Sequence, residues 1–153
     1  MHDIQTFIVN PGTPELATCA RWRAEGFSVL NASVEGERKS LEVFAADQRH
    51  QVALIAKRNG VPVGTCLLVQ SEIDPNHAVL PWLAGLFVVP EHRGRGAGAV
   101  LVRAIEEQAR HRGFSRVYLY THGAVSYYEK LGWDIVDRTM WKGFDTALMA
   151  RHL

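Results

Sequence analysis

The chain opens with a short apolar strand followed by a helix. Residues 4 to 9 are mainly apolar and are followed by Asn10-Pro11-Gly12, which predicts a strand that ends in a turn. Thr13-Pro14 is typical of a helix start. Apolar residues then recur at helical spacing, so we expect a helix from Pro14 to about Gly26.

A second helix and a hairpin are expected next. The helix is predicted over residues 37 to 49, where one face is apolar and the other is charged. Residues 52 to 58 and 61 to 70 are strand-like, and Asn59-Gly60 between them is a strong signal for a two-residue turn. We therefore expect two antiparallel strands here.

The central third contains a continuous apolar run. Residues 82 to 89 have the pattern of a strand buried on both faces, and Pro90 ends it. A glycine-rich loop follows. The helix after that loop is predicted to end at Gly113, and its apolar stripe is Leu101, Ala104, Ile105 and Ala109.

The last third predicts another strand around Val117 and Leu119, a short helix over Val125 to Leu131, and strands within residues 133 to 141 and 145 to 151. The expected order is βααβββαβαββ. That order indicates an α/β (α+β) fold with a mixed sheet and helices on both faces.

Length and composition favour one domain and a globular enzyme or binding protein. At 153 residues and 47% hydrophobic content the chain can bury one core, so we expect a single domain over residues 1–153. The chain has 17 Lys and Arg against 16 Asp and Glu, so its net charge creates no overall electrostatic field that would attract a nucleic acid or an anionic membrane. No apolar run reaches the ~18 residues of a membrane span and no secretion signal is evident, so a cytoplasmic protein is expected. Cys19 and Cys66 are far apart, and we expect no metal.

The glycine-rich loop Arg93-Gly94-Arg95-Gly96-Ala97-Gly98 carries the clearest chemical signal. It lies between a predicted strand and a predicted helix, whose first N–H groups have no intrahelical partner. Glycines let an oxyanion approach the backbone, and arginines add charge. The loop therefore predicts a phosphate site, whereas a plain glycine turn would not explain the arginines.

Two other phosphate motifs fit less well. Gly94-x-Gly96-x-x-Ala99 matches the dinucleotide fingerprint, but the acidic residue expected about 20 positions later is missing from residues 118 to 122. A nucleotide-dependent oxidoreductase remains a third hypothesis on this match alone. The Walker pattern fails because no Gly-Lys-Ser/Thr is present.

Two segments together carry a family resemblance. Phe87 to Gly98, followed by Leu101, resembles motif A of the GNAT superfamily of N-acetyltransferases. Tyr127-Tyr128-Glu129-Lys130-Leu131-Gly132-Trp133 resembles motif B of that family. The element order fits along nearly the whole chain, although residues 1 to 50 match only in pattern.

The resemblance implies acetyl-CoA as acetyl donor and an amine of a small molecule or peptide as acceptor; a homodimer is common in the family. It places the pyrophosphate on the amides of residues 93 to 98 and the pantetheine arm along strand 82 to 89. In this family that strand diverges from the next one and leaves a V-shaped gap for the thioester. The cofactor-binding residues we expect are Phe87, Val88, Val89, Arg93, Gly94, Arg95, Gly96, Ala97, Gly98, Thr121 and Tyr128.

Amine acetylation also needs an oxyanion donor, an acid for the thiolate and a neutral amine. By resemblance Tyr128 protonates the CoA sulfur, while Tyr127 is assigned to packing. A backbone N–H between Leu86 and Val89 suits the oxyanion.

The general base stays open, because strand 82 to 89 contains no acidic residue. The proton could be removed by a water chain or by one of four side chains, and an amine that is already neutral would need no base. These side chains are Glu72, Asp74, His77 and His122.

Some reactive or bulky residues are assigned to packing. Cys66 has no evident histidine partner, so we expect it to be buried rather than nucleophilic. The tryptophans are expected in the core, although Trp82 at the strand's start is also a candidate wall of an acceptor pocket. The leading hypothesis is an N-acetyltransferase, and the alternative is a catalytically idle CoA-binding module.

Overall fold

A computed structural model describes residues 3–26 and 33–153. Its strands form one seven-stranded sheet in the order β1-β2-β3-β4-β5-β7-β6, and the β4–β5 pair is parallel whereas the other neighbours are antiparallel. The strands are β1 (Ile4–Ile8), β2 (Val52–Arg58), β3 (Val61–Val69), β4 (Trp82–Val88), β5 (Arg116–Thr121), β6 (Asp134–Trp141) and β7 (Phe144–His152). The helices are α1 (Pro14–Gly26), α2 (Val34–Ala45), the 3-10 helix η2 (Pro90–His92), α3 (Ala97–His111) and α4 (Val125–Lys130).

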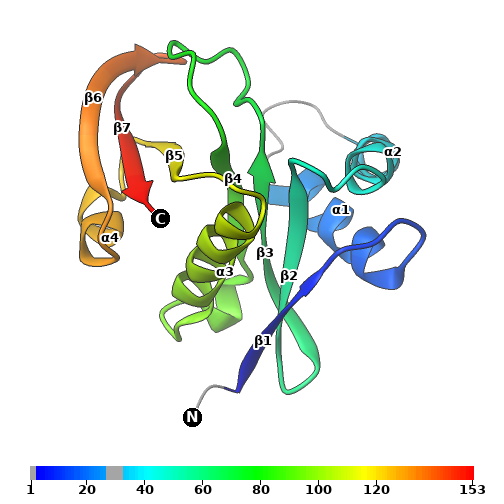
Figure 1. The fold of residues 1–153 in the computed structure, drawn as a ribbon. Helices are drawn as coiled ribbons and strands as arrows, with labels where there is room; N and C mark the ends of the chain where they lie inside the picture. Colours follow the sequence, from blue (N-terminus) through cyan, green and yellow to red (C-terminus); the bar gives the residue numbers. More distant parts are fainter. Residues whose placement is uncertain (1–2, 27–32) are drawn as a thin grey trace.

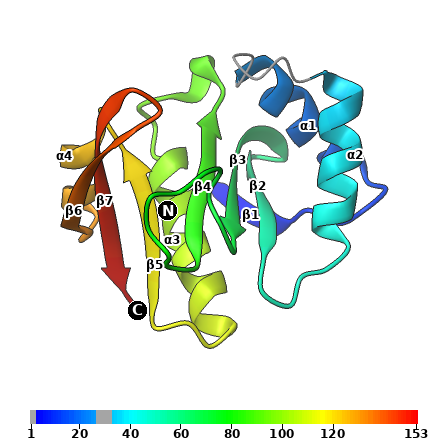
Figure 2. The ribbon, with the colours of Figure 1, turned by 90° about the horizontal axis from the view of Figure 1, so that it is seen from above.

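Helices cover both faces of the sheet, as Figures 1 and 2 show. The alternation of side chains along β2 explains the two layers. Leu54 and Ala56 pack with Leu101 and Ile105 of α3 in one core cluster. The intervening Ala53 and Ile55 belong to a second cluster with residues of α1 and α2. The mixed fold and the element order expected from the sequence are confirmed.

The hairpin between β2 and β3 turns at Asn59 and Gly60, as predicted. Both residues have positive φ angles, 49° and 82°. A two-residue turn of this kind matches the twist of antiparallel strands. The pairing Arg58↔Val61 closes the hairpin directly beside the turn.

Helix α2 begins earlier and ends earlier than the predicted range 37 to 49. Ser33 caps its start by accepting a hydrogen bond from Gly36 N–H at 2.9 Å, so the helix includes residues that the apolar stripe alone did not reveal. It ends at Ala45. Beyond it, the Asp47 carboxylate accepts hydrogen bonds from the Arg49 backbone and side chain in a local turn.

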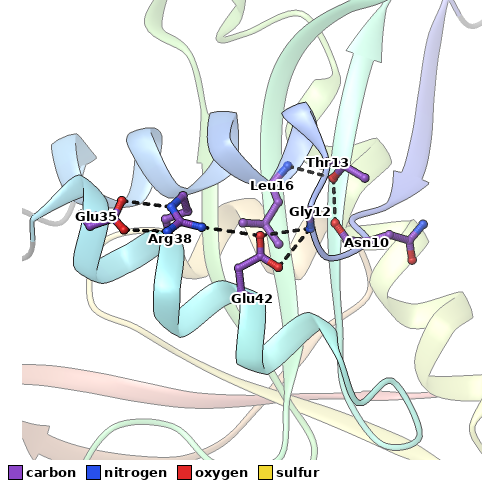
Figure 3. Close-up of polar contacts among 7 residues, drawn as sticks. All are labelled: Asn10, Gly12, Thr13, Leu16, Glu35, Arg38 and Glu42. Atoms are coloured by element: carbon purple, nitrogen blue, oxygen red, sulfur yellow. Dashed lines mark hydrogen bonds and ion pairs between the residues drawn. The ribbon is translucent and has the colours of Figure 1, made fainter.

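The start of α1 is held by capping contacts and by α2 (Figure 3). Thr13 Oγ1 donates to Asn10 O and accepts from Leu16 N–H at 3.3 Å, which is the predicted cap. The Glu42 carboxylate on α2 accepts from Gly12 N–H at 3.0 Å. These contacts tie the β1–α1 turn to α2.

Strand β4 is fully buried only at its start. Trp82 and Leu83 are buried, whereas the following residues of the strand are half-buried, so the prediction of burial on both faces holds for the first part alone. Within the described chain, β4 pairs with β5 only through Trp82 and Tyr118, with Tyr118 N–H donating to Pro81 O at 3.0 Å. Beyond this pair the two parallel strands part, which leaves the later residues of β4 without a sheet neighbour on that side.

None of the helices that the structure describes is long and apolar enough to cross a bilayer. Within residues 3–26 and 33–153, no three His, Cys, Asp or Glu side chains gather as a metal-binding group.

Candidate functional site

The loop between β4 and α3 exposes a helix N-terminus. Gly94 has a φ of 74°, and Gly96, with a φ of 92°, is the N-cap residue of α3. No side chain caps this helix. The N–H groups of its first turn therefore remain directed at the space in front of the helix, where an anion is stabilised by hydrogen bonds and by the helix dipole.

Two arginines hold the loop in place. Arg93 Nε donates to Val88 O at 2.8 Å, and its guanidinium lies 5.6 Å from the centre of the Phe87 ring. Arg58 on β2 donates to Arg95 O at 2.8 Å and pairs with Asp3 at 2.7 Å. The hydrogen bond from Arg58 lowers the pKa of the Asp3 carboxyl. The loop is thus anchored to β4 through the Arg93 side chain and to β2 through its backbone carbonyl at Arg95.

A cavity of about 550 Å³ lies beside this loop. Six of the predicted cofactor-binding residues line it: Phe87, Val88, Arg93, Gly94, Gly96 and Gly98. Leu86, His92, Ala99 and Tyr127 also line it and were not assigned from the sequence. His92 Nδ1 is buried and has no hydrogen-bond partner among the described residues, so it is a polar group available to a ligand.

The other five predicted residues are not part of the cavity lining. Val89 N–H donates to Val63 O at 2.9 Å and its side chain packs against both core clusters. Ala97 is buried, and Arg95 is exposed. Thr121 Oγ1 accepts from Ala124 N–H at 3.0 Å just before α4. The fifth residue, Tyr128, lies in the core.

The adjacent tyrosines of α4 differ in environment, and the difference corrects the assignment of Tyr127 to packing. Tyr127 is 40% exposed and lines the cavity, whereas Tyr128 is 8% exposed and packs in the core against the Trp133 ring. Consecutive helix residues point in different directions, so only one of the two can face the core. Burial, and to a smaller extent the nearby Cys66, raises the pKa of both phenols above the ordinary value.

Tyr127 lies against the first turn of α3. A Cβ atom placed on Gly98 would be only 2.7 Å from Tyr127 Oη, so a side chain there would have to displace the hydroxyl. The sequence signal for Tyr127 was its place beside Tyr128 in motif B, but its exposure was not readable from that motif.

The four base candidates lie in different surroundings. Glu72 accepts from the adjacent Ile73 N–H, and Asp74 is exposed. The His122 ring stacks on Phe144 with centroids 4.5 Å apart. His77 is hydrogen-bonded to both Tyr120 and Asp137. Of the four, His77 is the one in contact with two further titratable side chains.

Cys66 and most of the tryptophans are buried, as expected. Cys66 is fully buried, and burial raises the pKa of its thiol to about 12, which opposes a nucleophilic role. Trp22, Trp82 and Trp133 are buried and Trp141 is half-buried. Trp82 is therefore a core residue and not an exposed pocket wall.

Comparisons with solved structures show the same fold. An aminoglycoside 6'-N-acetyltransferase complexed with coenzyme A superposes with a TM-score of 0.78 at 18% identity, covering 97% of this chain and 96% of that one. The GNAT-family acetyltransferase from Streptococcus pneumoniae gives 0.73 at 18% identity, with 98% and 99% covered. The protein yncA from Salmonella typhimurium, with its cofactor acetyl-CoA, gives 0.72 at 17% identity, with 99% and 95% covered.

At the level of sequence, no curated protein matches the chain. A family model does match, over residues 16–133, and its description is acetyltransferase (GNAT) family. The matched segment includes both motifs, the glycine-rich loop and α4. Because the family model matches most of the chain, the chain belongs to the acetyltransferase (GNAT) family.

Proposed function

We propose that this chain binds acetyl-CoA and transfers its acetyl group directly to a primary amine of a small molecule or peptide. The observation that carries the proposal is the uncapped N-terminus of α3, which opens onto a cavity bordered by β4 and Tyr127. Structures of similar fold contain coenzyme A or acetyl-CoA, which supports the choice of cofactor.

The pyrophosphate is assigned to the amides of residues 94 to 98, because Arg93 N–H donates to Pro90 O at 3.3 Å. The helix dipole alone contributes ~0.3–2 kcal/mol, so several N–H hydrogen bonds must supply most of the affinity. Arg93 is already engaged by Val88 O through Nε, which leaves its terminal nitrogens to contact phosphate. Tyr127, on the cavity wall, is assigned to contact the cofactor near Gly98.

The pantetheine arm is assigned to the edge of β4 that β5 leaves unpaired. Beyond Trp82 this edge has no strand partner in β5, so the N–H and C=O groups on it that make no other hydrogen bond can pair with the amides of the arm. Ala84 O and Val88 O each already accept one hydrogen bond, from the Cys66 thiol and from Arg93 Nε. A β4 N–H between Leu86 and Val88 is assigned to the thioester oxygen, because a donor fixed by the sheet needs no reorganisation. Val89 N–H is excluded from this role, since it donates to Val63 O.

Tyr128 is assigned to assist the departing thiolate. Burial keeps the phenol neutral, so the hydroxyl remains a donor throughout the physiological range. A thiol has a pKa of ~8.5, below that of the phenol, so complete proton transfer is uphill. Tyr128 therefore acts mainly by donating a hydrogen bond as the C–S bond breaks.

A panel of amine acceptors with acetyl-CoA, measured by release of free thiol, tests the function. Amine-dependent thiol release above the rate with acetyl-CoA alone is expected for at least one class of primary amine. Binding of CoA without thiol release from any amine would contradict transferase activity and leave the chain as a CoA-binding module.

A further inference from the structure

Three side chains from separate elements meet beside the point where β4 and β5 part. His77 lies in the loop between β3 and β4, Tyr120 is on β5 and Asp137 is on β6. His77 Nδ1 is 2.8 Å from the Tyr120 hydroxyl, and His77 Nε2 is 2.8 Å from Asp137 Oδ2. A carboxylate, an imidazole and a phenol are thus connected in series.

The partners fix the direction of the hydrogen bonds. An ionised carboxylate only accepts, so Nε2 of His77 carries a hydrogen, and in the neutral imidazole Nδ1 then accepts from the Tyr120 hydroxyl. The hydrogen bond from His77 lowers the pKa of Asp137, which keeps that carboxylate ionised. Asn76 N–H also donates to the Tyr120 oxygen, at 3.0 Å. A hydroxyl oxygen can accept two hydrogen bonds, so one position on Tyr120 remains for a ligand N–H.

Strand alternation puts Tyr120 on the face of the sheet that α3 does not cover. Val117 and Leu119 belong to the core cluster that contains the residues of α3, so Tyr118 and Tyr120 point to the opposite face. The centroid of the Tyr120 ring lies 4.7 Å from that of Trp82, the β4 residue that pairs with β5. Tyr120 therefore lies at the closed end of the gap between the two strands.

We propose that Tyr120, His77 and Asp137 form a proton relay that removes the proton from the acceptor amine. The proposal rests on the proposed function, because it assigns the thioester to the gap between β4 and β5. Tyr120 is the catalytic residue that touches the amine, and His77 and Asp137 are positioning residues. The relay takes the place of the acidic residue that β4 lacks.

The acceptor enters as an ammonium and loses a first proton to the Tyr120 oxygen, while the original hydroxyl proton passes to His77 Nδ1. The lone pair that this frees forms the N–C bond, and the C–S bonding pair leaves with sulfur as a thiolate that accepts a hydrogen bond from Tyr128. The second proton leaves the nitrogen for water, and the thiolate takes up a proton from water. The imidazolium is stabilised by Asp137 and returns a proton to water, because the side chains of His77 and Asp137 are 18% and 59% exposed.

Titratable groups from two strands contact His77, and others lie in its own loop. Tyr120 on β5 and Asp137 on β6 are the titratable groups that contact it, and Arg138 follows Asp137 along β6. Its own loop carries Glu72 and Asp74.

The test is the pH dependence of Tyr120→Phe, which removes the hydroxyl and keeps the ring against Trp82. With the best alkyl amine of the panel, kcat/KM is expected to fall ~10²-fold near pH 7, a typical contribution of acid–base catalysis. The deficit is expected to shrink to less than ~10-fold near pH 10, because roughly 30% of an amine with a pKa of ~10.4 then arrives neutral, against roughly 0.04% near pH 7. The glutamine of His77→Gln can accept the hydrogen bond from Tyr120 but cannot take up its proton, so this variant is expected to show the same pH-dependent deficit as Tyr120→Phe.

Thr139→Val is the matched control. It removes the 3.0 Å hydrogen bond from the Asn76 side chain, which anchors the same loop, and leaves the relay intact. Near wild-type kcat/KM at all pH values is expected. No loss in Tyr120→Phe, a loss of equal size at every pH, or a loss in Thr139→Val as large as in Tyr120→Phe overturns the relay. Wild-type thiol release in the same assay reports on the proposed function itself, so the two failures are distinguishable.

Discussion

Replacing Gly96 by alanine separates backbone strain from loss of the phosphate site. Gly96 has a φ of 92° and caps the N-terminus of α3. A Cβ atom built there meets no heavy atom within 4 Å, so the substitution causes no clash inside the protein. The expected cost is the positive φ itself, ~1–2 kcal/mol in the free energy of unfolding. For a chain of this size that lowers Tm by about 2–8 °C.

Gly113, at the other end of α3, is the matched control. Its φ is 86°, and a Cβ atom there also meets nothing within 4 Å. Gly113→Ala therefore carries the same kind of strain, and its Tm is expected to fall by a similar amount. It lies outside the residues that line the cavity, so CoA affinity is expected to stay at the wild-type value.

Only Gly96→Ala is expected to weaken CoA binding. The new methyl group occupies the space through which the pyrophosphate approaches the amides, and we expect at least a ~10-fold higher Kd, about 1.4 kcal/mol. Isothermal titration calorimetry of folded wild type and both variants gives this comparison directly. Equal CoA affinity for the two variants would refute the assignment of the pyrophosphate to this loop.

Four further predictions concern the tyrosines and the cysteines. Tyr128→Phe is expected to lower kcat by ~10²-fold and to change the free energy of unfolding by less than ~1 kcal/mol, since only the hydroxyl is lost. Kinetics and thermal unfolding of the same sample measure both, and a wild-type kcat would contradict the hydrogen bond assigned from Tyr128 to the thiolate. The effects of Gly98→Ala and Tyr127→Phe on CoA affinity are expected to be coupled by ~0.5–1 kcal/mol, because the alanine methyl group displaces the Tyr127 hydroxyl. A double-mutant cycle measures this coupling, and additive effects would contradict the contact. Burial raises the thiol pKa of Cys19 to about 11 and of Cys66 to about 12, so both should resist a thiol reagent near pH 8 until the protein is unfolded. Since these folded-state pKa values exceed the unfolded value of ~8.5, stability is expected to decrease as pH rises from about 8.5 towards 11 in unfolding titrations.

Much of the fold was readable from local signals. Asn59-Gly60 set the hairpin turn and Thr13-Pro14 set the start of α1, because each acts through the backbone of its own segment. The predicted range of α2 was wrong by several residues, because the start of the helix depends on the Ser33 cap, which precedes the apolar stripe. The apolar pattern predicted burial along all of β4, but the exposure of its second half depends on where β5 diverges, which the family resemblance implied and the local pattern does not encode.

The candidate site was predictable in its backbone part and less so in its side chains. The glycine loop was found because conformational freedom and charge occur together at Gly94, Gly96 and Arg93. The exposure of Tyr127 depends on how α4 packs against α3, which the motif does not encode. The contacts of His77 with Tyr120 and Asp137 join residues 43 and 60 positions apart, and no local pattern predicts them.

Mass spectrometry of the reaction product tests the central claim most directly. Acetyl-CoA labelled in its acetyl carbon is incubated with the protein and the amine that gives the fastest thiol release. The account predicts that the label appears on the amine nitrogen in proportion to the free CoA produced. Label found only in free acetate, or an unmodified amine despite CoA release, would contradict acetyl transfer to an amine.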